Sequence, residues 1–158
     1  MEIRVGYGYD VHALVPGRDL WVGGMKIEHE FGLLGHSDAD VLIHAICDAL
    51  LGAAGMRDIG FHFPDTSADF KDIDSKILLK KVIELISEKG WNLSNIDATI
   101  CAERPKFKPY IPQMQICLAP LLNIEKDAVS IKATTSEKLG FTGREEGISA
   151  SAVVLITR

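Results

Sequence analysis

The sequence predicts a protein of the α/β or α+β class, in which helices cover one sheet. Strand signals and helix signals alternate along the chain, and no internal repeat, low-complexity segment or linker interrupts them. Strands are predicted at 3–9, 96–102, 129–133 and 148–156. Helices are predicted at 37–52, at 72–89 and from Pro112 onward. We therefore expect residues 1–158 to form a single domain.

The composition disfavours two classes of function. With 17 basic and 22 acidic side chains the net charge is −5, which argues against general nucleic-acid binding. No apolar run has the length of a membrane span, and no signal-peptide pattern occurs, so we expect no membrane association. The three cysteines, Cys47, Cys101 and Cys117, are expected to be buried thiols without disulfides. These features predict a cytoplasmic protein, or an organellar one if a targeting peptide has been removed.

The first predicted strand ends in two side chains that can bind a metal. Apolar residues alternate with small or polar ones over 3–9, and the strand runs into Asp10 and His12. Residues two apart in a strand point to the same face of the sheet. We therefore expect this carboxylate and this imidazole to be neighbours.

The segment 35–52 predicts an unusual helix. Ser37 and Asp40 have the spacing of a capping box, so we expect the helix to begin at Ser37. Its only polar line is Asp40, His44 and Asp48, because the other positions are apolar. A helix of this kind is expected to be surrounded by protein, where polar groups need partners.

These two segments together suggest a catalytic zinc site. Asp10, His12 and His44 would supply one carboxylate and two imidazoles, which leaves a fourth position open. We expect one of the helix carboxylates, Asp48 in preference to Asp40, to orient the His44 ring through its other nitrogen. The simpler alternatives are a turn cap at the strand end and a core histidine satisfied by a carboxylate one turn away.

Other segments are predicted to form the scaffold. A hairpin is expected where Gly23 and Gly24 separate two short apolar runs. The helix at 72–89 should end at Gly90, and Pro120 should kink or shorten the helix that Pro112 opens. The residues expected on the buried face of the 72–89 helix are Ile73, Ile77, Val82 and Ile86.

Basic and hydroxyl side chains near the later strand ends suggest an anion site. Glu137 follows a run of hydroxyl residues and could hold magnesium beside substrate phosphates. The alternatives are a solvated turn for the basic residues and an ordinary helix cap for the hydroxyl run. The residues in question are Arg104, Lys106, Lys108, Lys132, Thr134, Thr135 and Ser136.

Taken together, these motifs closely resemble the 2-C-methyl-D-erythritol 2,4-cyclodiphosphate synthase family, along nearly the whole chain. The stretches that carry the resemblance are Gly6-x-Gly8-x-Asp10-Val11-His12, 35–44, 58–60 with 63–66, 104–106 and 132–144. The resemblance implies a ferredoxin-like mixed sheet covered by helices in an α+β sandwich. It also implies a homotrimer with an active site at each subunit boundary.

The resemblance further implies a cyclising, CMP-releasing phosphorus-oxygen lyase of non-mevalonate isoprenoid biosynthesis. Its substrate would be the cytidine diphosphate 4-diphosphocytidyl-2-C-methyl-D-erythritol 2-phosphate. Asp10, His12 and His44 would hold one zinc or similar divalent metal, with a substrate phosphate oxygen as fourth ligand. Glu137 would help hold magnesium or manganese on the diphosphate. His36 and Thr135 would stabilise the transition state.

The resemblance assigns the remaining site residues by position. Ser37 would bind phosphate, 58–60 and 63–67 would line the methylerythritol pocket, and 102–108 with Thr134 would form the neighbouring subunit's cytidine site. Phe141 and Arg144, with Glu146, would face a trimer cavity that can hold an isoprenoid diphosphate. The full substrate-binding set is Asp10, Val11, His12, His36, Ser37, Asp58, Ile59, Gly60, Phe63, Pro64, Asp65, Thr66, Ser67, Ala102, Glu103, Arg104, Pro105, Lys106, Phe107, Lys108, Thr134, Thr135, Ser136, Glu137, Phe141 and Arg144.

Two rival functions use the same residues. A metal-dependent phosphohydrolase would activate water at the Asp10, His12 and His44 site and release inorganic phosphate. A non-catalytic zinc-stabilised oligomerisation or nucleotide-binding module would lose its assembly when zinc is removed. An open site with three protein ligands weighs against a purely structural zinc.

Overall fold

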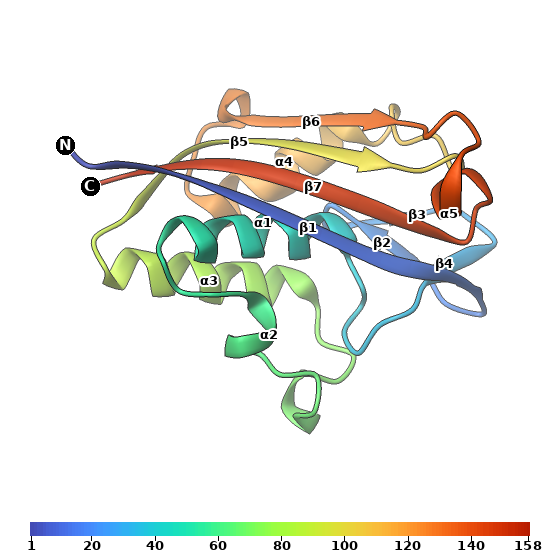
Figure 1. The fold of residues 1–158 in the computed structure, drawn as a ribbon, viewed down its shortest axis with the longest axis horizontal. Helices are drawn as coiled ribbons and strands as arrows, with labels where there is room; N and C mark the ends of the chain where they lie inside the picture. The colour runs from blue at the N-terminus through green and yellow to red at the C-terminus, as the bar shows by residue number, and fades with distance from the viewer.

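A five-stranded sheet runs along the long axis of the molecule, and both chain ends lie at the same end of it (Figure 1). The computed structural model describes residues 1–158. Its strands are β1 (Ile3–Pro16), β2 (Leu20–Val22), β3 (Met25–Ile27), β4 (Phe31–Leu33), β5 (Asn92–Cys101), β6 (Val129–Thr134) and β7 (Gly147–Thr157). Its helices are α1 (Val41–Ala53), α2 (Ile59–His62), α3 (Ser75–Glu88), α4 (Ile111–Leu122) and α5 (Gly140–Gly143), with 3-10 turns η1 (Ala68–Phe70) and η2 (Lys126–Ala128).

The main sheet has the strand order β4-β1-β7-β5-β6. Only β5 and β6 pair in parallel, and the other neighbours are antiparallel. The predicted hairpin forms a separate two-stranded sheet of β2 and β3. The α+β class and the ferredoxin-like mixed sheet covered by helices are therefore confirmed.

All the long helices lie on one side of the sheet. Helix α1 packs on β1 and β7, α4 packs on β6, and α3 packs outside against both helices. As predicted, α1 is surrounded by protein, since its apolar side chains belong to one continuous buried core. No helix of the molecule combines the length and the apolar character that a membrane crossing requires.

Two glycines of β1 allow α1 to approach the sheet closely. A Cβ atom added at Gly6 would lie 1.9 Å from the Ala49 carbonyl oxygen, and one added at Gly8 would lie 1.9 Å from the Ala45 carbonyl oxygen. The glycines therefore face α1, and the larger alternating side chains of β1 face the other way. Because β1 supplies Asp10 and His12 and α1 supplies His44, this contact sets the spacing of the predicted metal ligands.

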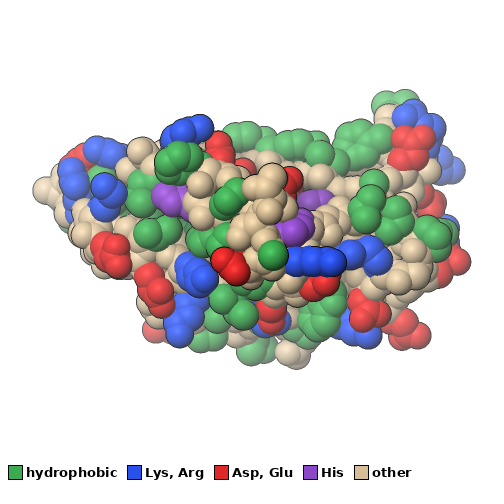
Figure 2. All heavy atoms as spheres, turned by 90° about the horizontal axis from the view of Figure 1, so that it is seen from below, with side chains coloured by type: hydrophobic (Ala, Val, Ile, Leu, Met, Phe, Trp, Pro, Cys, Tyr) green, Lys and Arg blue, Asp and Glu red, His purple; other side chains and the backbone are tan.

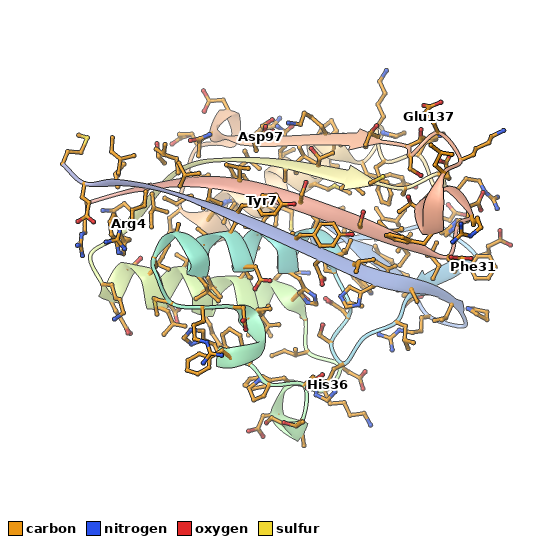
Figure 3. The ribbon with its side chains drawn as sticks, in the orientation of Figure 1. Arg4, Tyr7, Phe31, His36, Asp97 and Glu137 are labelled. Carbon is orange, nitrogen blue, oxygen red and sulfur yellow. The ribbon has the colours of Figure 1, made fainter.

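The opposite face of β1 and β7 is apolar and uncovered. Val5 and Tyr7 are both 64% exposed, and Val153 on β7 is 43% exposed. Figure 3 labels Tyr7 on this strand. We call this surface the apolar sheet face, and its members are Ile3, Val5, Tyr7, Tyr9, Val11 and Val153.

The start of α1 corrects the sequence prediction. Ser37 is not the N-cap, and no capping box forms, because α1 begins at Val41 with Asp40 as its N-cap. The Asp40 carboxylate accepts hydrogen bonds from the backbone N–H groups of Ile43, Gly23 and Gly24. Asp40 is completely buried, so these three donors explain why it caps the helix and also ties the β2–β3 hairpin to it.

Helix α3 also differs from the prediction in its start and in its buried face. It begins at Ser75 rather than Asp72, with Asp74 as N-cap, and the predicted stop at Gly90 is confirmed. Ile77 was predicted to face the core, but it is 48% exposed. Ile73 was also predicted on this face, but it precedes the helix and is only partly buried. The helix contacts both α1 and α4, so its buried face is set by Leu78, Leu79 and Ile83 as well as by the predicted Val82 and Ile86.

Two of the three cysteines are less buried than predicted, and Pro120 lies close to the end of its helix. Cys47 is buried, but Cys101 and Cys117 are only half-buried, which corrects the prediction that all three are buried. Cys101 ends β5, and Cys117 lies on α4 beside the hairpin, so both are at margins of the core. Pro120 lies inside α4, which ends soon after it at Leu122.

Candidate metal centre and substrate pockets

Asp10, His12 and His44 meet where β1 passes the first turns of α1. The Asp10 Oδ2 atom lies 2.8 Å from His12 Nε2 and 3.1 Å from His44 Nδ1. The two imidazole nitrogens lie 3.2 Å apart. One ligand atom from each residue falls within 4.8 Å of the others, so this group could hold a metal ion, as the sequence predicted.

The second nitrogen of each ring has its own partner. His12 Nδ1 donates to the Leu34 carbonyl oxygen at 2.8 Å, which leaves the lone pair of Nε2 facing Asp10. His44 turns Nε2 toward the hydroxyl groups of Ser75 at 2.9 Å and Ser37 at 3.2 Å. The centre therefore presents two imidazole nitrogens and a carboxylate oxygen, which is a donor set suited to zinc or a similar divalent metal.

The charges of the triad favour a cation. Burial alone would raise the pKa of Asp10, but the close contacts of its carboxylate with the His12 and His44 imidazoles outweigh burial and lower the pKa to about 2. Burial likewise opposes protonation of His12, yet the hydrogen bond and the charge of Asp10 raise the pKa of that imidazole. Asp10 is thus ionised at neutral pH, and the space beside it attracts either a proton or a metal.

The predicted helper carboxylates do not orient His44, which corrects the sequence analysis. Asp48 instead accepts a hydrogen bond from the Ile59 N–H at 2.7 Å. Asp40 accepts a hydrogen bond from the Ile43 N–H at the N-terminus of α1. The partner of His44 is Ser75, which the sequence analysis missed. Ser75 lies 31 positions further along the chain, and a serine at a helix start gave no signal of its own.

A cavity of about 360 Å³ opens beside the triad and brings together many of the predicted substrate residues. It lies on the side of the molecule that carries α2 and α3, where Figure 2 shows histidine side chains reaching the surface. Phe70, Ile73 and Leu78 line it as well, although the sequence analysis did not place them there. The predicted residues that line it are His12, His36, Ser37, His44, Ile59, Gly60, Phe63 and Asp65.

The segment between α2 and α3 contacts the cavity lining through His36 and two aromatic rings. His36 Nε2 donates to the Ser67 carbonyl oxygen at 2.9 Å. The rings of Phe63 and Phe70 pack edge to face with centroids 5.5 Å apart. Asp58 does not line the cavity, because it caps α2 by accepting from the Phe61 N–H at 2.8 Å. The other predicted residues outside the cavity lining are Asp10, Val11, Pro64, Thr66 and Ser67.

A second pocket, of about 190 Å³, lies at the ends of β5 and β6. Two predicted members lie outside it: Arg104 forms an ion pair with Glu145 at 2.7 Å, and Glu103 accepts from the Lys138 N–H at 2.9 Å. The predicted cytidine-site residues that line it are Ala102, Pro105, Lys106, Phe107, Lys108, Thr134 and Thr135.

The hydroxyl run after β6 forms a loop. The helix-cap alternative is wrong, since α5 begins later, at Gly140, without a side-chain cap. Thr135 Oγ1 donates to Glu137 Oε1 at 3.1 Å, which holds the predicted magnesium residue in place. Ser136 Oγ donates to the Leu139 carbonyl oxygen at 2.7 Å. Lys132, which was grouped with the anion-binding residues, pairs with Asp97 instead.

One chain does not bring the two pockets together. Figure 3 shows His36 and Glu137 at opposite edges of the molecule. The two pockets have no lining residue in common. Arg144 and Phe141 lie near the second pocket's end of the sheet, where Arg144 Nε pairs with Glu146 at 2.9 Å and the Phe141 ring is partly exposed.

Comparisons with known proteins agree on one family. The model described as the YgbB family matches residues 3–157. A curated protein of Phocaeicola vulgatus, named 2-C-methyl-D-erythritol 2,4-cyclodiphosphate synthase, is 71% identical over 158 residues, which cover 100% of this chain and 99% of that protein.

Solved structures show the same fold. The bifunctional IspDF of Campylobacter jejuni superposes with a TM-score of 0.94 at 43% identity; the match covers 98% of this chain and 42% of that one. A 2C-methyl-D-erythritol-2,4-cyclodiphosphate synthase in a CDP-bound form superposes with a TM-score of 0.90 at 35% identity, covering 98% of this chain and 100% of that one.

Proposed function

The chain belongs to the YgbB family and has the role of a cyclodiphosphate synthase, and from this premise we propose that it acts on 4-diphosphocytidyl-2-C-methyl-D-erythritol 2-phosphate. The products would be 2-C-methyl-D-erythritol 2,4-cyclodiphosphate and CMP. This reaction would supply a precursor in the non-mevalonate route to isoprenoids. The observation that carries the proposal is the Asp10, His12 and His44 triad beside a cavity of about 360 Å³, which His12 and His44 help to line.

The proposed step is an intramolecular phosphoryl transfer. An oxygen of the 2-phosphate attacks the β-phosphorus of the diphosphate and forms a new phosphorus–oxygen bond. The bond from the β-phosphorus to the oxygen that bridges to the α-phosphorus breaks, and CMP leaves with that oxygen. No water is consumed, so the enzyme is a lyase that cyclises its substrate. Such a transfer needs positioned groups and neutralised charge more than a protein nucleophile.

The triad residues would hold zinc or a similar divalent metal. When bound, this metal and a magnesium or manganese ion at Glu137 would supply Lewis-acid polarisation of the phosphoryl oxygens and neutralise the leaving group. Asp10 is held ionised by its two histidine neighbours, and His12 keeps Nε2 free because Nδ1 is occupied by Leu34. These residues are thus prepared to receive a cation.

We propose that His36 and Thr135 stabilise the charge that develops in the transition state. His36 and Ser37 both line the cavity beside the triad, where polar side chains can contact phosphate oxygens. Thr135 lies in the second pocket and already contacts Glu137, which places a donor beside the proposed magnesium residue. The methylerythritol part would fill the cavity lined by Ile59, Gly60 and Phe63.

The second pocket is the proposed cytidine site. Support comes from the relative solved in a CDP-bound form, which has the same fold over 98% of this chain. The pocket lies at the ends of two parallel strands, and its Lys106 and Lys108 give it positive charge for a nucleotide phosphate. The remaining predicted substrate-binding residues lie on the segments that surround these two pockets.

The separation of the two pockets supports a shared active site. A substrate that carries both a methylerythritol phosphate and a cytidine must reach both pockets, yet one chain places them at opposite edges. We therefore propose a homotrimer in which each site combines the triad of one subunit with the cytidine pocket of its neighbour. The apolar sheet face is the surface that we expect the subunits to bury.

We also propose that residues 1–158 form one domain, which is supported by the family match to 3–157 and by the continuous core.

We further propose that Phe141 and Arg144 face a cavity on the trimer axis that can bind an isoprenoid diphosphate. Unchanged thermal stability in saturating farnesyl diphosphate would count against that ligand. The cytoplasmic location stays a prediction.

Phosphorus NMR of the purified protein with this substrate and magnesium tests the reaction. We expect the coupled signals of a cyclic diphosphate, one CMP per turnover and no inorganic phosphate. A His44→Ala sample should give no product. Inorganic phosphate in place of the cyclic product would support the phosphohydrolase, and unchanged substrate with the zinc-loaded wild type would support a binding module.

A further inference from the structure

Ser75 occupies a position that links the metal triad to a second helix. It is completely buried and is the first residue of α3. Its Oγ atom lies 2.9 Å from His44 Nε2, which is the ring nitrogen that faces away from Asp10 and His12. Ser75 belongs to none of the sets of residues that the proposed reaction uses.

The direction of the hydrogen bond from His44 follows from Asp38. The Ser75 hydroxyl makes a very short contact with Asp38 Oδ1, and the Ser75 backbone N–H donates to Asp38 Oδ2 at 3.0 Å. An ionised carboxylate can only accept, so the single hydroxyl proton of Ser75 must point to Asp38. The Ser75 oxygen is then left to accept a proton from His44 Nε2.

This chain of hydrogen bonds determines which nitrogen of His44 has a free lone pair. With its proton on Nε2, the neutral ring directs the lone pair of Nδ1 at the triad, where Asp10 Oδ2 lies at 3.1 Å. A neutral His44 with the opposite tautomer would point an N–H group at the metal position and could not bind a cation there.

Further hydrogen bonds hold Asp38, the residue that orients the Ser75 hydroxyl, in place. Asp38 Oδ1 also accepts from the Asp40 N–H at 3.1 Å, and the Asp38 N–H donates to the Ile73 carbonyl oxygen at 3.1 Å. Asp38 is thereby fixed to the start of α1 and to the segment before α3. Ser37 Oγ is the other hydroxyl near His44 Nε2, but it lies further away, at 3.2 Å, and has no carboxylate to orient its proton.

We propose that Ser75, held by Asp38, is a positioning residue that locks His44 in the Nε2–H tautomer and thereby sets the metal affinity of the triad. The inference rests on the proposed metal site, although the tautomer itself exists without metal. Groups that fix the outer nitrogen of a metal-binding histidine typically change metal affinity by about 10–100-fold when removed. The same hydrogen bonds link the metal triad to the first turn of α3.

Nitrogen-15 NMR of the metal-free protein, at a pH where the imidazoles are neutral, measures the tautomer directly. We expect wild-type His44 to be protonated on Nε2 alone and Ser75→Ala to show both tautomers. Zinc titration against a competing chelator should show about 10–100-fold weaker binding in Ser75→Ala. Ser75→Thr, which keeps the hydroxyl, should retain the wild-type tautomer and affinity.

Two matched controls separate this effect from a general loss of structure. Ser37→Ala removes the other hydroxyl near the same nitrogen and should weaken zinc binding less than Ser75→Ala. Ser130→Ala removes a serine that donates to Asp97 far from the triad, and it should leave zinc affinity unchanged.

Two results would overturn the inference. One is a wild-type His44 protonated on Nδ1, which needs no variant and holds even if Ser75→Ala fails to fold. The other is a folded Ser75→Ala protein with the wild-type tautomer and zinc affinity. Failure of the wild type to bind zinc, with His44 protonated on Nε2, would instead contradict the metal site in the proposed function.

Discussion

His12 and His44 face each other with unlike nitrogens, Nε2 of His12 and Nδ1 of His44, at a distance of 3.2 Å. Asp10 Oδ2 lies within 3.1 Å of both. Three electron-rich atoms this close repel one another unless a cation lies between them. In the metal-free protein the positive charge comes from a proton on His12, so the stability of the fold depends on the pH.

Metal-free protein should gain stability from the Asp10–His12 pair only in mildly acidic solution. Because the pKa of His12 is raised in the folded protein, protonated His12 stabilises the fold at pH values below its unfolded pKa of about 6.5. This stabilisation is lost as the pH rises through the folded pKa of His12. Because the pKa of Asp10 is lowered to about 2, its ionised carboxylate stabilises the fold at pH values above the unfolded pKa of Asp10. This stabilisation is lost as the pH falls toward about 2.

Urea unfolding of the metal-free wild type and Asp10→Asn across this range measures the effect. We expect Asp10→Asn to be less stable by about 2 kcal/mol between about pH 4 and pH 6.5, with a smaller difference outside that window. A difference that stays constant from acidic to alkaline pH would show that the pair does not behave as described.

Asp40→Ala should destabilise the fold strongly. It removes the N-cap of α1 and leaves the N–H groups of Gly23 and Gly24 without their acceptor. The expected loss in the free energy of unfolding is about 3 kcal/mol, measured in urea. The control is Asp97→Ala, which breaks an exposed ion pair with Lys132 and should cost less than about 1 kcal/mol. Equal losses would contradict the role given to Asp40.

Gly8→Ala tests the close contact between β1 and α1. The added Cβ would lie 1.9 Å from the Ala45 carbonyl oxygen, so strand and helix must separate, at a cost of about 3 kcal/mol. Gly52 is an exposed residue of the same helix, where an added Cβ would meet nothing closer than the Tyr7 carbonyl oxygen at 4.0 Å. Gly52→Ala should therefore stabilise the protein by about 0.5–1 kcal/mol. Thermal unfolding of both variants gives the comparison, and a neutral Gly8→Ala would rule out the tight packing.

A charge on the apolar sheet face should disrupt the assembly. Tyr7 is 64% exposed in one chain, and we expect its neighbours to cover it in the trimer. Tyr7→Lys should shift the mass in light scattering toward the monomer, because a buried unpaired charge is costly. Ile77→Lys adds the same charge to an exposed position on α3 and should leave the trimer intact. A trimeric Tyr7→Lys protein would place the interface elsewhere.

The sequence predicted every strand except β4, the long helices α1, α3 and α4, and the three residues of the triad, because these depend on local periodicity and spacing. It could not predict that Gly6 and Gly8, rather than the larger residues between them, face α1. Strand alternation identifies two faces but does not determine which one a helix covers. That choice depends on how closely α1 approaches the strand.

The partners of the buried polar groups were harder to predict. Asp40 and Asp48 share a helix face with His44, which suggested a local partner, yet both carboxylates bind backbone N–H groups of other segments. The actual partner, Ser75, comes from a helix that packs across α1. A contact of this kind depends on the tertiary packing of two helices and leaves no spacing in the sequence to detect.

The shared active site is tested most directly by co-expressing two inactive variants. His44→Ala removes a residue of the metal triad, and Thr135→Ala removes a donor of the second pocket. In a randomly mixed trimer, a subunit with an intact triad meets a neighbour with an intact second pocket at about one quarter of the boundaries.

CMP release by the purified mixed protein is the measurement. If each site combines two subunits, the mixture should recover about one quarter of the wild-type activity, although either variant alone is nearly inactive. If the triad and Thr135 of one chain served the same site, every chain in the mixture would carry a defect. A mixture no more active than the single variants would therefore contradict a site shared between subunits.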